Sequence, residues 1–323
     1  MAAPRLGLGF LGFPDLRAMV EAGIRAEEKG FESAWVAETR ITRDAVTGMT
    51  ALLLATRTLR VGSAAINVFT RGAALVAVTW ATLAEAAPGR VVLGLGGGSA
   101  IPLGQQGLPH DHTVSRMREF TEAVRGAWAA ATPFSYSGHY VHFEGLEPEV
   151  RPAHPPSIYF CVAGPRALAC AAQVADGVVF DAFLPPSYVA SARAALDAAA
   201  PSSHYGGELA GVLVVSIQPT VAEAVVPLRP LLANYLVNFP ELASVTGIDV
   251  ELVTRMREVR VDGGLEAAAA LLGDDLIAQH ALCGPPAAIR ERLGEYRAAG
   301  LGLPVLCPVP SSLDAAIADL AGS

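Results

Sequence analysis

The feature that most constrains the fold is an alternation, repeated eight times, between short apolar runs and segments with helical spacing. The runs are rich in valine, isoleucine and leucine, as are strands buried on both faces of a parallel sheet. Eight βα units with short connections favour a closed barrel over an open sheet. The sequence therefore predicts an α/β fold, a (β/α)8 TIM barrel. The expected strands are residues 6–11, 33–38, 61–67, 91–95, 157–162, 177–181, 212–217 and 303–307.

The segment between the seventh and eighth expected strands is too long for a single crossover helix. It predicts a helical insertion at about residues 221–282, before the last strand. A chain of 323 residues is long for one domain, but such lengths are ordinary for α/β barrels. No low-complexity linker divides the chain, so we expect a single domain over residues 1–323.

Composition excludes several classes of function. The net charge of −8 argues against general nucleic-acid binding, which needs clustered lysine and arginine. Lys29 is the single lysine, which disfavours Schiff-base chemistry and a Walker-type phosphate site. The four cysteines form no C-x-x-C pair and indicate free thiols in a reducing compartment. No apolar run reaches membrane-spanning length. We expect a cytoplasmic homodimer with a small-molecule substrate and no membrane or nucleic-acid partner.

A barrel of this kind builds its active site from the residues that follow the C-terminal ends of its strands. The fourth expected strand ends in three consecutive glycines, which let a backbone come close to a ligand; a plain tight turn is the alternative. A glycine-rich, apolar mouth suits a flat heteroaromatic cofactor better than hydrolysis. The cofactor-binding candidates at these ends are Phe10, Ala65, Asn67, Gly96, Gly97, Gly98, Ser99, Ala163, Gly164, Pro165, Arg166 and Ala182.

Ala163-Gly164-Pro165-Arg166 predicts the start of a helix. Pro165 fits the first helical turn, because its missing N–H would have no partner there. The free amide groups of a helix start attract a phosphate, and Arg166 adds a positive charge. The alternative is an ordinary N-terminal turn with an exposed arginine.

Common motifs of nucleophilic and metal-dependent catalysis are missing from the sequence. There is no G-x-S-x-G, no H-E-x-x-H and no G-x-G-x-x-G between a strand and a helix. His110 and His112 flank Asp111, but no other histidine or cysteine is placed to complete a site. We therefore predict no metal and interpret this segment as a solvated loop.

Several segments together resemble the bacterial luciferase-like superfamily, and most closely its branch that uses the deazaflavin coenzyme F420, which includes methylenetetrahydromethanopterin reductase and its actinobacterial relatives. The match follows the family order over nearly the whole chain. The matching segments are W-V-A-E at 35–38, V-G-S-A-A-I-N-V-F-T-R at 61–71, G-R-V-V-L-G-L-G-G-G-S at 89–99, V-A-G-P-R-A-L at 162–168, A-D-G-V-V at 175–179 and C-G-P-P-A-A-I-R-E-R-L at 283–293.

The resemblance implies a barrel with an insertion, in agreement with the alternation of elements. It also implies a non-proline cis peptide between Ala64 and Ala65, against which the cofactor ring rests. The phosphate site of the family maps to residues 164–166, and the glycine loop at 96–99 maps to the wall beside the cofactor.

The resemblance further implies an F420-dependent oxidoreductase that transfers a hydride between deazaflavin C5 and a small organic substrate. An FMN-dependent luciferase-like monooxygenase is the alternative, and a non-catalytic relative is a third. Glu38 is the catalytic candidate, to handle a proton or orient the substrate; a salt bridge with Arg40 or Arg71 is the competing explanation. Many relatives have a histidine where this chain has Glu38-Thr39, so the substrate contacts of the family do not all carry over.

Overall fold

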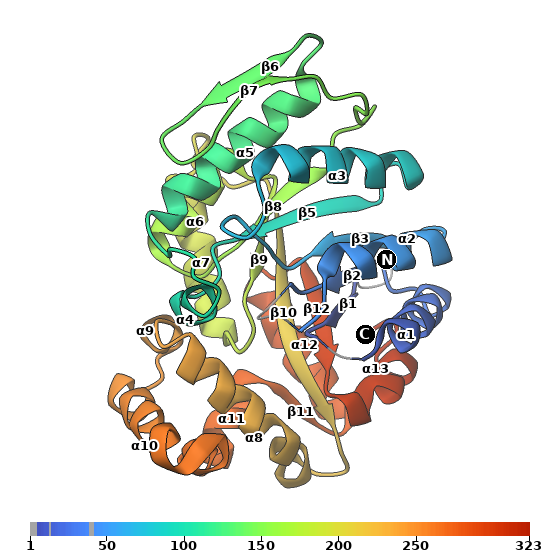
Figure 1. The fold of residues 1–323 in the computed structure, drawn as a ribbon. Helices are drawn as coiled ribbons and strands as arrows, with labels where there is room; N and C mark the ends of the chain where they lie inside the picture. The colour runs from blue at the N-terminus through green and yellow to red at the C-terminus, as the bar shows by residue number, and fades with distance from the viewer. Residues whose placement is uncertain (1–4, 13, 39–41) are drawn as a thin grey trace.

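Eight parallel strands close into a barrel in the computed structural model, which describes residues 5–12, 14–38 and 42–323 (Figure 1). Each strand pairs with two neighbours, and the last pairs with the first: Gly7 lies opposite Val305. The (β/α)8 prediction is confirmed. In order around the ring the strands are β1 (Gly7–Phe10), β2 (Ser33–Val36), β3 (Arg60–Ser63), β5 (Val91–Gly96), β8 (Ser157–Cys161), β9 (Gly177–Phe180), β10 (Glu208–Ile217) and β12 (Leu303–Pro308).

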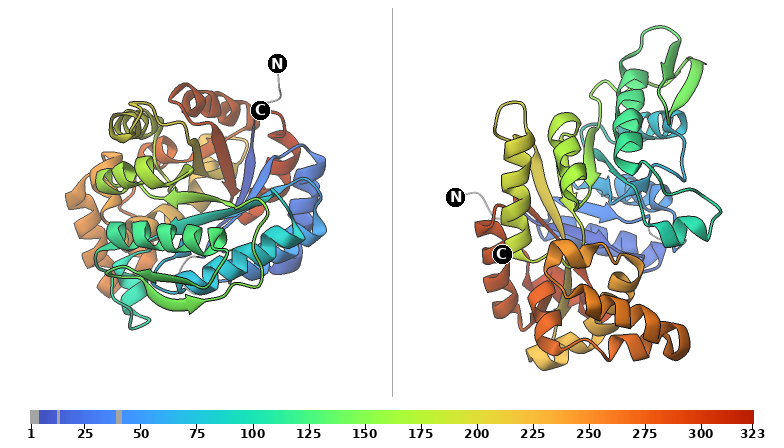
Figure 2. Two further views of the ribbon diagram at one scale, coloured as in Figure 1. Left: turned by 90° about the horizontal axis from the view of Figure 1, so that it is seen from above. Right: turned by 90° about the vertical axis from the view of Figure 1, so that its left-hand side faces the viewer.

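Helices surround the barrel, as a parallel sheet buried on both faces requires (Figure 2). An antiparallel hairpin lies beside α5, within the loop region where a short hairpin over 134–143 is expected from sequence. The helices are α1 (Leu16–Glu28), α2 (Ala45–Ala55), α3 (Ala73–Ala86), α4 (Ala100–Gly104), α5 (Thr113–Ala129), α6 (Pro165–Val174), α7 (Pro186–Ala199), α12 (Pro286–Ala298) and α13 (Leu313–Asp319), with the 3-10 turn η1 (Pro310–Ser312); the hairpin is β6 (Phe134–Ser137) and β7 (His142–Leu146).

The predicted insertion is present between β10 and β12. Its helices gather at one side of the barrel, in orange at the lower left of Figure 1. They are followed by a short strand that pairs with the end of β10 and that the sequence did not predict. These elements are α8 (Val221–Asn238), α9 (Leu242–Thr246), α10 (Val250–Ala269), α11 (Asp274–His280) and β11 (Leu282–Gly284).

The period of two along each strand divides the core into an inner and an outer part. On β12, Val305 packs inside the barrel, whereas Leu306 packs beneath the surrounding helices. The inner part continues into the insertion, where Leu232 and Met256 join the same cluster. The insertion therefore shares a core with the barrel interior and is held against the ends of its strands.

The third strand departs from the prediction of one continuous strand over 61–67. It is divided into β3 and the two-residue β4 (Ile66–Asn67), and the bond between Ala64 and Ala65 is cis, as the resemblance implies. Two hydrogen bonds hold the end of β3 against β5 at this point: Ser63 Oγ donates to Gly94 O and accepts from Gly94 N, both at 2.9 Å. A Cβ on Gly94 would lie 1.8 Å from Ser63 O, so only glycine allows this approach.

Candidate active site

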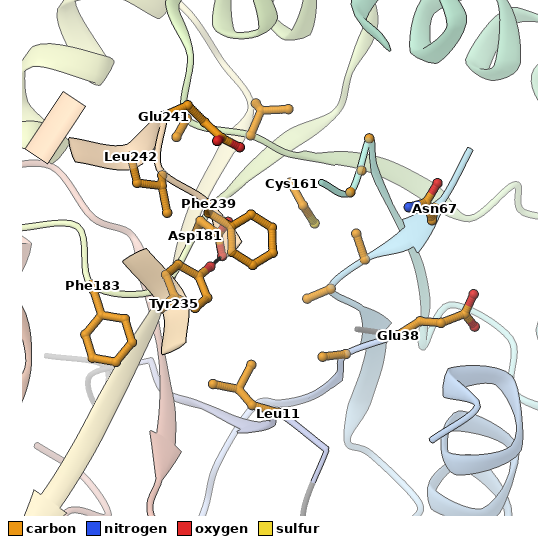
Figure 3. A pocket seen from close by; sticks show the side chains of 18 of the residues that line it. Leu11, Glu38, Asn67, Cys161, Asp181, Phe183, Tyr235, Phe239, Glu241 and Leu242 are labelled. Atoms are coloured by element: carbon orange, nitrogen blue, oxygen red, sulfur yellow. Dashed lines mark hydrogen bonds between the residues drawn. The ribbon is translucent and has the colours of Figure 1, made fainter. Parts of the chain in front are cut away.

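A cavity of about 640 Å³ lies at the C-terminal ends of the strands. Its lining residues follow those ends directly: Leu11 comes after β1, Glu38 after β2 and Asp181 after β9. The far side comes from the insertion, whose side chains face the barrel mouth in Figure 3. From the insertion the cavity is lined by Pro230, Leu231, Asn234, Tyr235, Phe239, Glu241, Leu242 and Leu265.

One wall of the cavity is nearly bare backbone. Ala64 and Ala65 form it together with Gly96, and a Cβ on Gly96 would lie only 3.0 Å from the Ala65 Cβ. Gly97 and Gly98 continue the same wall. The structure thus brings the predicted cis peptide at Ala64-Ala65 and the predicted glycine loop, which are far apart in sequence, into one wall of small residues.

Neighbouring side chains fix the glycine loop in place. A Cβ on Gly97 would lie 1.9 Å from Thr113 Cγ2, and one on Gly98 would lie 2.1 Å from Asn67 Nδ2. Gly98 also has φ +64°, a backbone conformation that L side chains rarely adopt. Asn67, which lines the cavity as predicted, accepts a hydrogen bond from the N–H of Phe69 at 2.8 Å. The loop therefore has little room for any side chain.

The start of α6 borders the cavity through Ala163, Gly164 and Ala167. Gly164 is the N-cap residue, and no side chain caps this helix. In the part of the chain that the structure describes, the N–H groups of Ala163 and Gly164 have no backbone acceptor. Unpaired N–H groups at a helix start form an anion-binding site, which fits a phosphate.

Pro165 and Arg166 lie just outside the cavity lining, and both are exposed. Pro165 occupies the first turn of α6, as predicted. The Arg166 side chain makes no hydrogen bond or ion pair with the residues that the structure describes. Its place beside the unpaired N–H groups leaves it free to reach an anion there.

Glu38 lines the cavity and forms an ion pair with Arg71. Arg71 also pairs with Asp44. The hydrogen bond with Glu38 is the main cause that raises the pKa of Arg71, against the opposing effect of burial. For Asp44, burial raises the pKa, but hydrogen bonds from Thr47 and the pairing with Arg71 outweigh it and leave the pKa lowered. The competing explanation for Glu38, a salt bridge with Arg71, is thus observed; Arg40 lies outside the described residues.

Asp181 and Tyr235 meet across the cavity, and neither is among the site residues predicted from sequence. The Tyr235 hydroxyl donates to Asp181 Oδ1, and the N–H of Ala182 donates to the same oxygen at 2.9 Å. Burial raises the pKa of Asp181, and Tyr235 and Ala182 only partly oppose it. Burial, followed by the Asp181 charge, raises the pKa of the Tyr235 hydroxyl.

Comparison with known proteins identifies the family. A sequence model described as Luciferase-like monooxygenase matches residues 2–302. The chain belongs to this family. The resemblance seen in the sequence motifs is thereby confirmed.

Relatives within and near the luciferase-like family are similar over most of their length. 5,10-Methylenetetrahydromethanopterin reductase of Methanolobus tindarius is 25% identical over 274 residues, 84% of this chain and 83% of the relative. The structure of coenzyme F420-dependent tetrahydromethanopterin reductase from Methanopyrus kandleri has a TM-score of 0.86 at 21% identity and covers 98% of both chains. An F420-dependent secondary alcohol dehydrogenase in complex with an F420–acetone adduct has a TM-score of 0.81 at 20% identity, covering 100% of this chain and 99% of the other. At these identities the structural likeness shows a shared fold.

Three predicted cofactor contacts lie elsewhere in this luciferase-like barrel. Phe10 and Ala182 are 2% and 1% exposed and belong to the core, because alternate residues at a strand end turn away from the cavity. Ser99 is buried as well, and its hydroxyl donates to Asn238 O at 2.6 Å. Ser99 therefore ties the glycine loop to the end of α8 instead of lining the cavity.

In the described residues, no three His, Cys, Asp or Glu side chains gather to hold a metal ion. The rings of His110 and His112 lie against Phe69 and Tyr140 respectively. All four cysteines are free. Among the described helices, none combines the length and the apolar character needed to cross a membrane.

Proposed function

We propose that the chain is an enzyme, an F420-dependent oxidoreductase that transfers a hydride between deazaflavin C5 and a small organic substrate. The observation that supports this most directly is the bare wall formed by Ala64, Ala65 and Gly96 beside the start of α6. A flat ring needs a wall without projecting side chains, and its phosphate needs unpaired N–H groups such as those at the start of α6. The names of the similar proteins point to the same cofactor.

The residues present fit a deazaflavin. The cavity volume, about 640 Å³, lies in the range of small-molecule and cofactor sites. Its lining is largely apolar; the polar side chains are Glu38, Thr42, Asn67, Thr113, Asp181, Asn234, Tyr235 and Glu241. Ala163 and Gly164 would hold the phosphate through their N–H groups, and Arg166 would add a charge from the exposed side.

The protein's part in the reaction is to bind, orient and exclude water. When bound, the cofactor supplies a hydride donor or acceptor at C5. Ala64, Ala65 and Gly96 would support one face of the ring. Leu231 and Phe239 from α8 and its end would cover the opposite side and keep water from the reacting atoms. The substrate would then lie between the ring and the insertion, in the part of the cavity that Phe183 and Tyr235 line (Figure 3).

An FMN-dependent monooxygenase is the second candidate, because the family model is described as Luciferase-like monooxygenase and FMN is the alternative cofactor. The two cofactors differ in the chain attached to the ring: the chain of FMN ends at one phosphate, whereas that of F420 continues in an oligoglutamate tail that needs an open groove. Titration of the purified protein with F420 and with FMN, followed by fluorescence, separates them. We expect tighter binding of F420. Preference for FMN, with oxygen consumption when the FMN is reduced, would replace this proposal with the monooxygenase.

A further inference from the structure

One oxygen of the Asp181 carboxyl group accepts hydrogen bonds from the described residues, and the other accepts none. Oδ1 accepts the hydrogen bonds of Tyr235 and Ala182. Oδ2 makes no hydrogen bond with the described residues, yet it is not among the enclosed polar atoms that lack a partner. The side chain is only partly accessible and lines the cavity, so Oδ2 is the oxygen left open toward a ligand.

The groups that face Asp181 keep it free of a stabilising positive charge. Tyr235 comes from α8 and Glu241 from the turn before α9, and the Glu241 carboxylate raises the pKa of Asp181. Cys161 on β8 and Tyr188 on α7 feel the Asp181 charge, and burial is the main cause that raises the pKa of each. The side chains of Tyr235, Cys161 and Tyr188 therefore stay uncharged near neutral pH. Burial and a nearby carboxylate therefore both favour the protonated form of Asp181.

We propose that Asp181 is the acid that delivers a proton from Oδ2 to the substrate, and that Tyr235 is the residue that positions it. This inference rests on the proposed function and narrows its substrate class to compounds with a C=O or C=N bond. Hydride addition to the carbon of such a bond leaves an electron pair on the heteroatom, which must take up a proton. An isolated apolar C=C bond has no such atom.

With the reduced cofactor bound, its hydride would pass to the substrate carbon, so that the cofactor would be oxidised and the C=X π bond broken. The Oδ2–H bond breaks, and its proton forms the O–H or N–H bond of the reduced product. The proton that the reduced cofactor also loses returns to the Asp181 carboxylate through water. In the reverse direction the Asp181 carboxylate accepts the proton from an alcohol or amine.

The carboxyl titration of Asp181 tests the proposal without turnover. The 13C resonances of protein labelled at aspartate Cγ are followed against pH, with and without F420, and Asp181→Asn assigns the signal. We expect the Asp181 carboxyl group to titrate above its ordinary pKa of 3.8. In Tyr235→Phe its pKa should rise further, because a hydrogen bond to the charged form is lost. An Asp181 carboxyl group that titrates at or below 3.8 would overturn the proposal.

A kinetic arm uses acetone as the probe ketone with reduced F420. General acids contribute roughly 100-fold or more, so Asp181→Asn should lower kcat by about that factor. The KM for acetone and the affinity for F420 should change less than about threefold. Asp275→Asn, on the exposed first turn of α11, makes the same change of charge away from the cavity and should leave both unchanged. Equal turnover in Asp181→Asn and wild type would overturn the proposal.

The two proposals fail in different ways. If wild-type protein does not bind F420, the proposed function fails, whatever the state of Asp181. If it binds F420 but Asp181 titrates as an ordinary carboxyl group, only the inference about the proton donor fails. The carboxyl titration decides the second point even where acetone is a poor substrate.

Discussion

Arg71 holds both carboxylate oxygens of Glu38 at the edge of the cavity: its Nε lies 3.0 Å from Oε1 and its Nη2 lies 2.7 Å from Oε2. The side chains of Glu38 and Arg71 are 18% and 22% exposed, so water screens the pair only in part. This geometry fixes the Glu38 carboxylate in place at the edge of the cavity. It gives Glu38 a structural task that competes with the catalytic role predicted from sequence.

Glu38→Gln separates these two roles. Glutamine keeps a hydrogen-bond acceptor for Arg71 but removes the negative charge, and Asp44 remains as a second partner. We expect a loss of about 1 kcal/mol in the free energy of unfolding and a fall in turnover of less than roughly tenfold. Urea denaturation and steady-state kinetics measure the two effects. A fall of a hundredfold or more with unchanged F420 affinity would instead assign proton transfer to Glu38.

The glycine loop is expected to tolerate no side chain at position 97. The cofactor is the neighbour expected from the sequence, but in the structure a Cβ at this position would lie 1.9 Å from Thr113 Cγ2. Gly97→Ala should therefore displace the start of α5 or the loop and weaken F420 binding by about tenfold, because overpacking costs about 1–3 kcal/mol. Thr113→Ser removes the clashing methyl group, so the double variant should recover affinity. Gly104→Ala, where nothing lies within 4 Å of the added Cβ, is the control.

Arg166 is expected to bind the cofactor phosphate together with the N–H groups of Ala163 and Gly164. Its side chain has no partner in the described part of the chain, so its removal should leave the fold intact. Arg166→Ala should weaken F420 binding by roughly 1–3 kcal/mol, the scale of a charged hydrogen bond. The loss should shrink at high salt, since the arginine is exposed. Affinity that is the same in the variant would make Arg166 an ordinary surface arginine.

The barrel was predictable because most of its strands have a recognisable local sequence pattern. Strands such as β5 and β12 are buried on both faces, so their whole length is apolar and stands out against the helices. The first four residues of β10 were not predicted, because Glu208 interrupts the apolar pattern. The Glu208 carboxylate forms ion pairs with Arg5 and Arg60. The three-residue β11 was not predicted, because so short a run shows no periodicity.

The site was predictable only where a strand end or motif marks it. Consecutive residues at a strand end and at a helix start predicted Gly96 to Gly98 and Gly164, and the family resemblance implied the cis peptide at Ala64-Ala65; the structure places all of them at the cavity. Tyr235 was missed because it lies on α8, and nothing in the helical pattern says which of its residues faces a barrel mouth. Asp181 had a weak signal, its place at the end of β9, but its hydrogen bond to Tyr235 depends on how the insertion packs.

The last prediction concerns stability and pH at the opposite end of the barrel. Glu208 accepts hydrogen bonds from Arg60 Nη2 at 2.8 Å and from the Tyr159 hydroxyl at 2.7 Å, and it also pairs with Arg5. Burial raises the pKa of Glu208, but the hydrogen bonds and charges of these partners outweigh it and hold the pKa below the ordinary value of 4.5. A carboxyl group with a lowered pKa in the folded state adds stability above its unfolded pKa and loses it as the pH falls through the folded one.

Glu208→Gln should therefore cost about 2–3 kcal/mol in the free energy of unfolding near neutral pH, as expected for breaking a largely buried ion pair. The difference from wild type should narrow as the pH falls below about 4.5, because the wild-type carboxylate then becomes protonated too. Urea denaturation across this range measures it. Glu85→Gln, an exposed position on α3, is the matched control and should show a small, pH-independent effect. A Glu208→Gln deficit that stays constant down to the acid limit would mean that the lost contact is steric and not electrostatic.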